Sequence, residues 1–512
     1  MVSREQFDEI ARAHPGLAVP MSLGLSAQDL GGDEDVSPFS IYLRLANEPR
    51  TFLLESADPA SRFGRYSYIG LRAGKVLTVA DGAVRAGFAD GSVQTIETGD
   101  VWAEMARFAE SARSAPLPGA PGFAGGVAGF LGYECNCLLE PKLKRPAPKP
   151  SAVGIPDACL LQVDRLCVVD GLERRVELIV LADPGQDGGY ELGRERLLAM
   201  RDKLKRTGVR AFPSKSGDFH ATTLTAREEF EAMVAQCAEA VAAGDAIRLT
   251  PGLCVKAAFA EDPVLLYRAI ARAHPAEFMY YFDFGDFSLA GSSEEILARV
   301  EGRRLFARPV SFVSEAAPDP QRSALEPASA DKTQKRKSEP LFRSAKERLA
   351  AGHATLVDLA RNDAARVCKP GSAAVEEKMR AFGAGPDAGV ASLIAGELKD
   401  GLGAFDALRS AFPAGSLAGA PKIRAMEIVD GLEPRKRGAY GGAAGYVSAL
   451  GDMGMVSVSR AATVKDGFMY RQCGSAVVLD SDPALEWSKR EQDALDAERW
   501  AKDAAAFPGP GR

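Results

Sequence analysis

The sequence contains few histidines, no long hydrophobic run and no excess of positive charge. Its 512 residues include four histidines, too few for a centre that holds a metal through several imidazole rings. No apolar run approaches the roughly 18 residues that a membrane-spanning helix requires. The formal net charge of -6 disfavours nucleic acid, because phosphate binding needs clustered positive side chains. We therefore expect neither nucleic acid nor a membrane among the partners.

Cysteines are also scarce, with eight scattered along the chain. Cys135 and Cys137 form the one close pair, and no second pair completes a zinc site of the usual spacing. Free thiols in a reducing compartment are the expected state. The N-terminal stretch MVSREQFDEIARAHP is charged and lacks the hydrophobic core of a signal peptide. The cytoplasm is the expected location.

The pattern of apolar residues divides the chain into regions. Residues 1–182 contain short apolar and β-branched runs bounded by Gly, Asp and Pro, which is typical of strands. Residues 183–222 are predicted to be a linker region that includes one charged amphipathic helix, and residues 223–500 alternate helices with strands. The polar segment 313–340 is expected to be a mobile loop, and residues 501–512 a flexible tail.

Two helices have clear start signals. Thr225 and Glu228 match a capping box, and apolar residues at helical spacing follow them. Pro421 suits the first turn of another helix, because its missing N–H costs nothing there. The preceding residues 415–420 are almost all small and would leave backbone N–H groups uncovered for an anion, with Lys422 at the mouth. The alternative is a tight turn that needs small residues for packing.

The last part of the chain combines glycine-rich strands with a few polar side chains. Tyr440 lies in the run GAYGGAAGY, Arg460 lies on a predicted strand, and residues 474–476 form a small-residue turn. An arginine beside exposed backbone N–H groups suits a carboxylate ligand. Each feature also has a simpler explanation, as a surface arginine or as a turn within a sheet. Together they indicate a small polyanionic substrate bound between strands.

Ordered motifs along nearly the whole chain carry a family resemblance: LLES (53–56), GGVAGFLGYE, GSSEE (291–295), LVDLARND, FPAGSLAGAPKIRAME, GAYGGAAGY and DSDP. The chain resembles component I of anthranilate synthase and its chorismate-using relatives. This implies an α/β (α+β) fold of packed antiparallel β-sheets with surrounding helices. It also implies chorismate as substrate, Mg²⁺ as cofactor and a separate glutamine amidotransferase subunit that supplies ammonia. The implied products are anthranilate and pyruvate, in tryptophan biosynthesis.

The resemblance also assigns roles to individual residues. Glu295 would be the acid that protonates the departing hydroxyl of chorismate. The site would also be lined by Ser416 and by Lys422 as a second catalytic residue. The carboxylates of chorismate would be held by Tyr440, Arg460, Gly474, Ser475 and Ala476. A tryptophan feedback pocket near the N-terminal sheet would include Glu55, Ser56 and Met279.

The match breaks at the expected metal ligands. Magnesium needs hard oxygen ligands in near-octahedral array, and the family supplies them mainly as two glutamate pairs spaced i, i+3 on helices. The first pair would fall at Leu349 and Gly352, neither of which is acidic. The second would fall at Glu486 and Lys489, so Glu486 is the one surviving carboxylate ligand. Phe312 also stands where the family has a glycine beside the substrate.

Three hypotheses about function stay open. The first is an enzyme of the anthranilate synthase type. The second is a catalytically inactive or repurposed paralogue that binds an amidotransferase or a chorismate-like ligand. The third is metal-free chemistry, in which the Lys489 ammonium takes the place of magnesium and Asp493 is its i, i+4 partner. A single positive charge is a poor substitute for a divalent Lewis acid, and a surface salt bridge is the simpler explanation.

Overall fold

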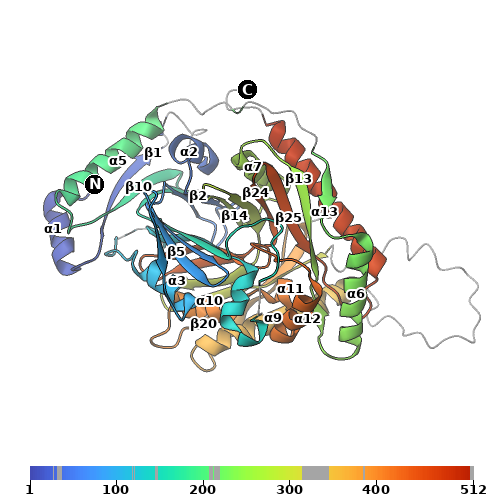
Figure 1. Cartoon of the computed structure of the whole chain (residues 1–512). Coiled ribbons are helices and arrows are strands. Elements are labelled where there is room, and N and C mark those ends of the chain that lie inside the picture. The colour runs from blue at the N-terminus through green and yellow to red at the C-terminus, as the bar shows by residue number, and fades with distance from the viewer. Residues whose placement is uncertain are drawn as a thin grey trace, which may run out of the picture.

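Figure 1 shows the chain as a computed structural model. The structure describes residues 1–26, 28–30, 37–117, 119, 122–144, 148–206, 212, 219–313, 345–383 and 387–507. Residues 314–340 of the expected mobile loop and residues 508–512 of the expected tail lie outside these ranges.

Two large antiparallel sheets form the centre of the fold (Figure 1). The first sheet has eleven strands. In order across the sheet they are β1 (Val19–Ser26), β10 (Arg175–Ala182), β9 (Arg165–Asp170), β3 (Tyr66–Gly70), β2 (Thr51–Glu55), β14 (Phe278–Asp283), β15 (Ser288–Ser293), β24 (Arg460–Lys465), β25 (Phe468–Gly474), β13 (Gly252–Ala258) and β11 (Ala221–Thr223).

The second sheet has twelve strands. Its order is β18 (Val310–Phe312), β20 (Gly389–Glu397), β17 (Arg304–Arg308), β16 (Ile296–Glu301), β23 (Met453–Ser457), β22 (Ala443–Ser448), β7 (Gly126–Leu131), β8 (Ala158–Val163), β4 (Lys75–Ala80), β5 (Ala83–Phe88) and β6 (Val93–Ile96), and β19 (Ala374–Phe382) also pairs with β20. A two-stranded sheet joins β12 (Arg248–Leu249) to β21 (Gly419–Ala420).

In both large sheets, the strands from residues 1–182 form one block and the strands from the rest of the chain form a second block beside it. Leu54 of β2 pairs with Tyr280 of β14 in the first sheet, and Ala128 of β7 pairs with Tyr446 of β22 in the second. The region 1–182 therefore has no sheet of its own, and the candidate site is built on a frame to which both halves contribute.

Helices cover the outer face of each sheet, as expected for the α/β (α+β) class. Buried side chains of α1 (Arg4–Ala13), α2 (Pro38–Leu45), α5 (Gly189–Lys205), α6 (Arg227–Ala242), α7 (Pro263–Ala273) and α13 (Pro483–Ala505) share one core with the first sheet. Those of α3 (Val101–Glu110), α9 (Ala345–Val367) and α10 (Ala404–Ala411) share another with the second. Ala425 and Val429 of α12 (Lys422–Leu432) also belong to the core of the first sheet. The helices α4 (Asn136–Leu139) and α11 (Gly415–Ala418) have only four residues each. No helix within the described ranges has the length and apolar content that crossing a bilayer demands.

Local signals explain where several helices start and end. Asp482 caps α13 by accepting a hydrogen bond from the backbone N–H of Leu485 at 3.0 Å, and Pro483 follows at the first helical position. Residues 501–505, expected within a flexible tail, form the last turn of α13, where Ala501 and Ala504 are buried. The capping box expected at Thr225 is wrong, because α6 has Ala226 as its N-cap residue and no side-chain cap.

The two sheets pack face to face through a core rich in aromatic side chains. Phe282 is fully buried there, with Phe52 and Phe284 at ring-centroid distances of 5.8 and 5.6 Å. In the same core, Phe123 of the loop before β7 and Tyr446 of β22 stack at a ring-centroid distance of 4.3 Å. Because these rings occupy the space between the sheets, their volume sets the sheet separation on which the site depends.

Removal of one of these rings tests how tightly the core between the sheets is packed. We expect Phe282→Ala to lower the free energy of unfolding by about 3–5 kcal/mol, because it leaves a cavity in a closely packed core. Phe282→Leu should cost clearly less. Denaturant unfolding followed by tryptophan fluorescence measures both, and equal stability of the two variants would contradict a tightly packed interface between the sheets.

Candidate functional site

Glu295 is the centre of the candidate site. It lies between β15 and β16, and its side chain is buried. Ser416 of α11 and Ser457 at the end of β23 each donate a hydroxyl hydrogen bond to its Oε2 atom, at 2.7 and 2.6 Å. Glu295 and Ser416 were expected to lie together and they do, whereas no motif pointed to Ser457.

A small pocket lies beside Glu295. Its wall is mostly apolar, and small side chains of α9 and α10 leave the space: Ala360, Ala364, Ala407 and Ala411. The polar groups on this wall come from Glu295, Asp363 and Ser416. An apolar cavity with a few converging polar groups is the usual form of a small-molecule site.

Lys422 has a different place from the one expected. Its ammonium donates to Asp363 Oδ2 at 2.6 Å and to the carbonyl oxygen of Ala411 at 2.8 Å. Asp363 lines the cavity beside Glu295, but Lys422 lines a neighbouring basin formed by α10 and α12. Burial raises the pKa of Asp363, and the charge of Lys422 opposes this rise. The ammonium thus neutralises a buried carboxylate and reaches the cavity only through it.

The small residues before α12 are required by packing. A Cβ atom on Gly419, whose φ is +116°, would lie 2.5 Å from the carbonyl oxygen of Arg248, and one on Gly415 would lie 2.7 Å from Leu359. The backbone of Gly419 and Ala420 pairs with β12. The structure therefore supports the tight turn, since this stretch uses its small size to approach neighbouring backbone rather than to leave an open anion site.

Tyr440 and the turn at 474–476 lie together. A Cβ on Gly474 would stand 2.8 Å from the Tyr440 hydroxyl oxygen, so only glycine fits. The Gly474 carbonyl accepts a hydrogen bond from Arg490 Nη1 at 2.6 Å. Ser475 is 2% exposed, and its hydroxyl has no hydrogen-bond partner among the described residues. A buried hydroxyl without a partner is costly, so Ser475 is a candidate for contact with a ligand, beside Ala476.

Arg460, at the start of β24, already contacts a carboxylate of the protein. Its Nη1 atom lies 2.9 Å from Asp387 Oδ1, and its guanidinium lies 4.0 Å above the Phe312 ring. His274 Nδ1 is 3.0 Å from the same Asp387 oxygen. Burial raises the pKa of Asp387, but the hydrogen bond of His274 and the charge of Arg460 outweigh burial and hold it below its ordinary value. A ligand carboxylate at Arg460 must therefore compete with Asp387.

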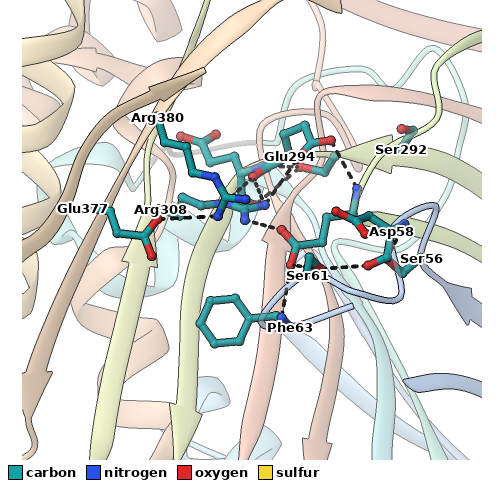
Figure 2. Close-up of polar contacts among 12 residues, drawn as sticks. Ser56, Asp58, Ser61, Phe63, Ser292, Glu294, Arg308, Glu377 and Arg380 are labelled. Atoms are coloured by element: carbon teal, nitrogen blue, oxygen red, sulfur yellow. Dashed lines mark hydrogen bonds and ion pairs between the residues drawn. The ribbon is translucent and has the colours of Figure 1, made fainter. Parts of the chain in front are cut away.

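A buried ion-pair network positions the backbone before Glu295 (Figure 2). Arg308 of β17 pairs with Glu277 and with the Glu294 carboxylate, and its Nη2 atom donates to the Glu294 carbonyl oxygen at 2.7 Å. Ser61, in the loop after β2, donates to Glu277 Oε1 at 2.7 Å. The loop after the LLES motif thus supports the segment that carries Glu295.

The three residues expected in a feedback pocket all line a second cavity, which lies between the two sheets. Glu55, Ser56 and Met279 contribute to its wall, together with Tyr446 and Arg299. Burial raises the pKa of Glu55 to about 7, against the lowering effect of Arg268 on α7. The structure brings the three residues together, and tryptophan binding there stays a prediction.

The residues present do not fit a magnesium ion. Glu486 of α13 is buried, and its Oε1 atom accepts a hydrogen bond from Lys489 Nζ at 2.7 Å. Within the described ranges, no three His, Cys, Asp or Glu side chains gather in a group that could hold a metal. Asp493 was expected to pair with Lys489, and this was wrong. Asp493 pairs instead with Arg490 at 2.9 Å and with Arg471.

The motifs and the fold place this chain in a family of chorismate binding enzymes. A sequence profile described as chorismate binding enzyme matches residues 50–492, and the chain belongs to that family. Anthranilate synthase component 1 of Pseudomonas aeruginosa is 38% identical over 461 residues, covering 88% of this chain and 90% of that protein. The same component of Neisseria meningitidis serogroup B is 36% identical over 500 residues, covering 96% and 97%.

Solved structures agree with this assignment. Anthranilate synthase component I from Streptococcus pneumoniae superposes with a TM-score of 0.67 at 25% identity, over 91% of this chain and 98% of that one. The menaquinone-specific isochorismate synthase of Escherichia coli has a TM-score of 0.61 at 14% identity, over 97% and 98%, and shows the fold alone. The family resemblance and the fold class expected from the motifs are confirmed.

The raised pKa of Glu55 gives a pH dependence of stability. The folded carboxyl keeps its proton up to about pH 7, whereas the unfolded one releases it at the ordinary value of 4.5. Between these values the folded state binds more protons, so the free energy of unfolding falls as pH rises. We expect Glu55→Gln to remove on the order of 2 kcal/mol of this fall.

Denaturant unfolding at pH 5 and pH 7.5 measures the effect, and the surface variant Glu397→Gln is the control. Glu134 and Asp283 also have raised pKa values, but they titrate alike in both proteins and cancel in the difference. Parallel pH profiles for Glu55→Gln and the native chain would contradict the buried, protonated carboxyl.

The contact between Asp387 and Arg460 predicts a gain of binding. We expect Asp387→Asn to strengthen chorismate binding by about threefold or more, because the guanidinium loses a competing charge. The asparagine oxygen can still contact His274. Calorimetry measures the affinity, with Asp400→Asn, a change at a carboxylate that is 90% exposed, as the control. Unchanged or weaker binding would show that the pair is structural only.

Proposed function

We propose that this chain is an anthranilate synthase component I, which binds chorismate beside Glu295 and converts it with ammonia. The main observation behind this proposal is the buried carboxyl of Glu295, which accepts hydrogen bonds from two serine hydroxyls at the wall of the pocket. Support comes from relatives named anthranilate synthase component 1 at 36–38% identity over most of the chain. Such a biosynthetic enzyme would work in the cytoplasm.

The proposed reaction converts chorismate and ammonia to anthranilate, pyruvate and water. The nitrogen forms a bond to the ring, the ring hydroxyl leaves as water, and the enolpyruvyl group leaves as pyruvate. Departure of the hydroxyl needs a proton, and Glu295 is the group assigned to deliver it. Ser416 and Ser457 hold one oxygen of this carboxyl in place. Ser475 and Arg460 are the groups assigned to the ligand carboxylates.

The proposed ammonia source is a glutamine amidotransferase on a separate chain. The relatives that carry the name component 1 support this, because the name itself implies a second component. Ammonium salts can replace such a partner in an assay, so the chemistry of this chain can be tested alone.

A second candidate function is binding of chorismate, or of an amidotransferase, without turnover. Two observations favour it: a lysine stands at one of the expected metal-ligand positions, and Arg460 already holds a carboxylate of the protein. Chorismate binding without anthranilate formation, at high ammonium with and without Mg²⁺, would support this candidate and contradict the first.

The role of Glu295 separates the two candidates. We expect Glu295→Gln to lower kcat for anthranilate formation by about 100-fold or more, because the amide cannot deliver the proton. The affinity for chorismate should change only a few-fold. Anthranilate fluorescence measures the rate and calorimetry the affinity, with Glu229→Gln on the exposed face of α6 as the control. A native rate in Glu295→Gln would exclude this carboxyl as the acid.

A further inference from the structure

We propose that the Glu486–Lys489 ion pair replaces the divalent cation of the family, so that this chain binds its carboxylate ligand without metal. The inference rests on the proposed binding of chorismate, and it concerns the charge of the site rather than the acid Glu295. Lys489 Nζ lies 2.7 Å from Glu486 Oε1, and the Glu486 side chain is 5% exposed. One carboxylate oxygen of the expected metal site is thus already bound to an ammonium.

The side of the expected metal site that α9 forms also lacks carboxylates. By the family pattern it should present two acids from α9, at the positions of Leu349 and Gly352. The ion pair of Arg348 with Asp480, at 3.0 Å, ties the first turns of α9 to the loop just before α13. A Cβ on Gly352 would meet no atom within 4 Å, so the space for an acidic side chain is present and unused.

The balance of charge explains how a ligand can bind without metal. Four carboxylates around one divalent cation carry a net charge of minus two, whereas Glu486 and Lys489 together carry none. A ligand carboxylate therefore approaches a less negative site here, even with no cation bound. The lysine also offers N–H donors, which a carboxylate accepts directly.

The surroundings of the ion pair offer further groups for a carboxylate. The residue after Lys489 is Arg490, whose Nη1 atom holds the Gly474 carbonyl at 2.6 Å. The next residue in that turn is Ser475, with its buried hydroxyl lacking a partner among the described residues. Lys489 is 30% exposed, so its ammonium can exchange part of its contact with Glu486 for a ligand. The ligand class is a small dicarboxylate, with chorismate as the probe.

Direct metal titration tests the first half of the proposal. Mn²⁺ binding is followed by electron paramagnetic resonance with the full chain and with the triple variant Leu349→Glu/Gly352→Glu/Lys489→Glu, which restores the acids of the family pattern. We expect no stoichiometric binding to the native chain and one bound ion in the triple variant. A bound ion in the native chain, or none in either protein, would overturn the proposal, provided that circular dichroism shows the triple variant folded.

Chorismate titration tests the second half. We expect the Kd of the native chain to agree within about twofold between EDTA and 5 mM MgCl₂, and that of the triple variant to depend on Mg²⁺. Lys489→Met would leave Glu486 buried and unpaired, so the neutral double variant Glu486→Gln/Lys489→Met accompanies it. Both should bind about tenfold more weakly, since a charge-assisted contact is lost. Lys489→Arg should stay within about threefold.

The outcomes separate this proposal from the proposed function. Loss of native chorismate binding in EDTA, or native affinity in the neutral double variant, overturns the metal-free site while chorismate binding stands. Absence of chorismate binding in every condition overturns the proposed function and the ligand assignment, and the Mn²⁺ titration still decides the metal question. The control Lys502→Ala, at an exposed position on the same helix, should leave every affinity unchanged.

Discussion

The candidate site is organised by one electrostatic constraint: a charge that is removed from water needs an opposite charge or hydrogen-bond donors close by. Within the described residues, side chains of the protein itself supply these contacts. The partners are Ser416 and Ser457 for Glu295, Lys422 for Asp363, Lys489 for Glu486, and Asp387 for Arg460. These charged groups are therefore paired with side chains of the protein itself, and in the metal-free binding proposed above a ligand exchanges some of these contacts.

The frame that holds these groups depends on strands from both halves of the chain. The aromatic core between the sheets sets their separation, and the Arg308 network attaches the loop after β2 to the segment before Glu295 (Figure 2). Ile296, the next residue along, lines both the cavity beside Glu295 and the cavity between the sheets. A small displacement of β16 would thus alter both cavities, because closely packed strands transmit movement instead of absorbing it.

Much of the site could be predicted from motifs, but the partners of its residues could not. Glu295 and Ser416 lie in separate motifs, and their roles suggested that they meet, as the structure confirms. Asp363 lies within the quoted LVDLARND motif, yet only the fold brings it to Lys422, 59 residues further along the chain. Ser457 and Asp387 had no sequence signal, because a serine or an aspartate at a strand end is common and gains meaning only from what packs against it.

The sequence by itself determined the family, the class of fold and the loss of acidic side chains at the expected metal positions, because these depend on residue identity and order along the chain. Tertiary structure decided which charge neutralises which. Lys489 could pair with Asp493 or with Glu486 on the same helix, since both spacings permit contact. It pairs with Glu486 because Arg490 and Arg471 already hold Asp493 against β25. Such a choice depends on side chains from distant segments, which the local pattern of one helix does not contain.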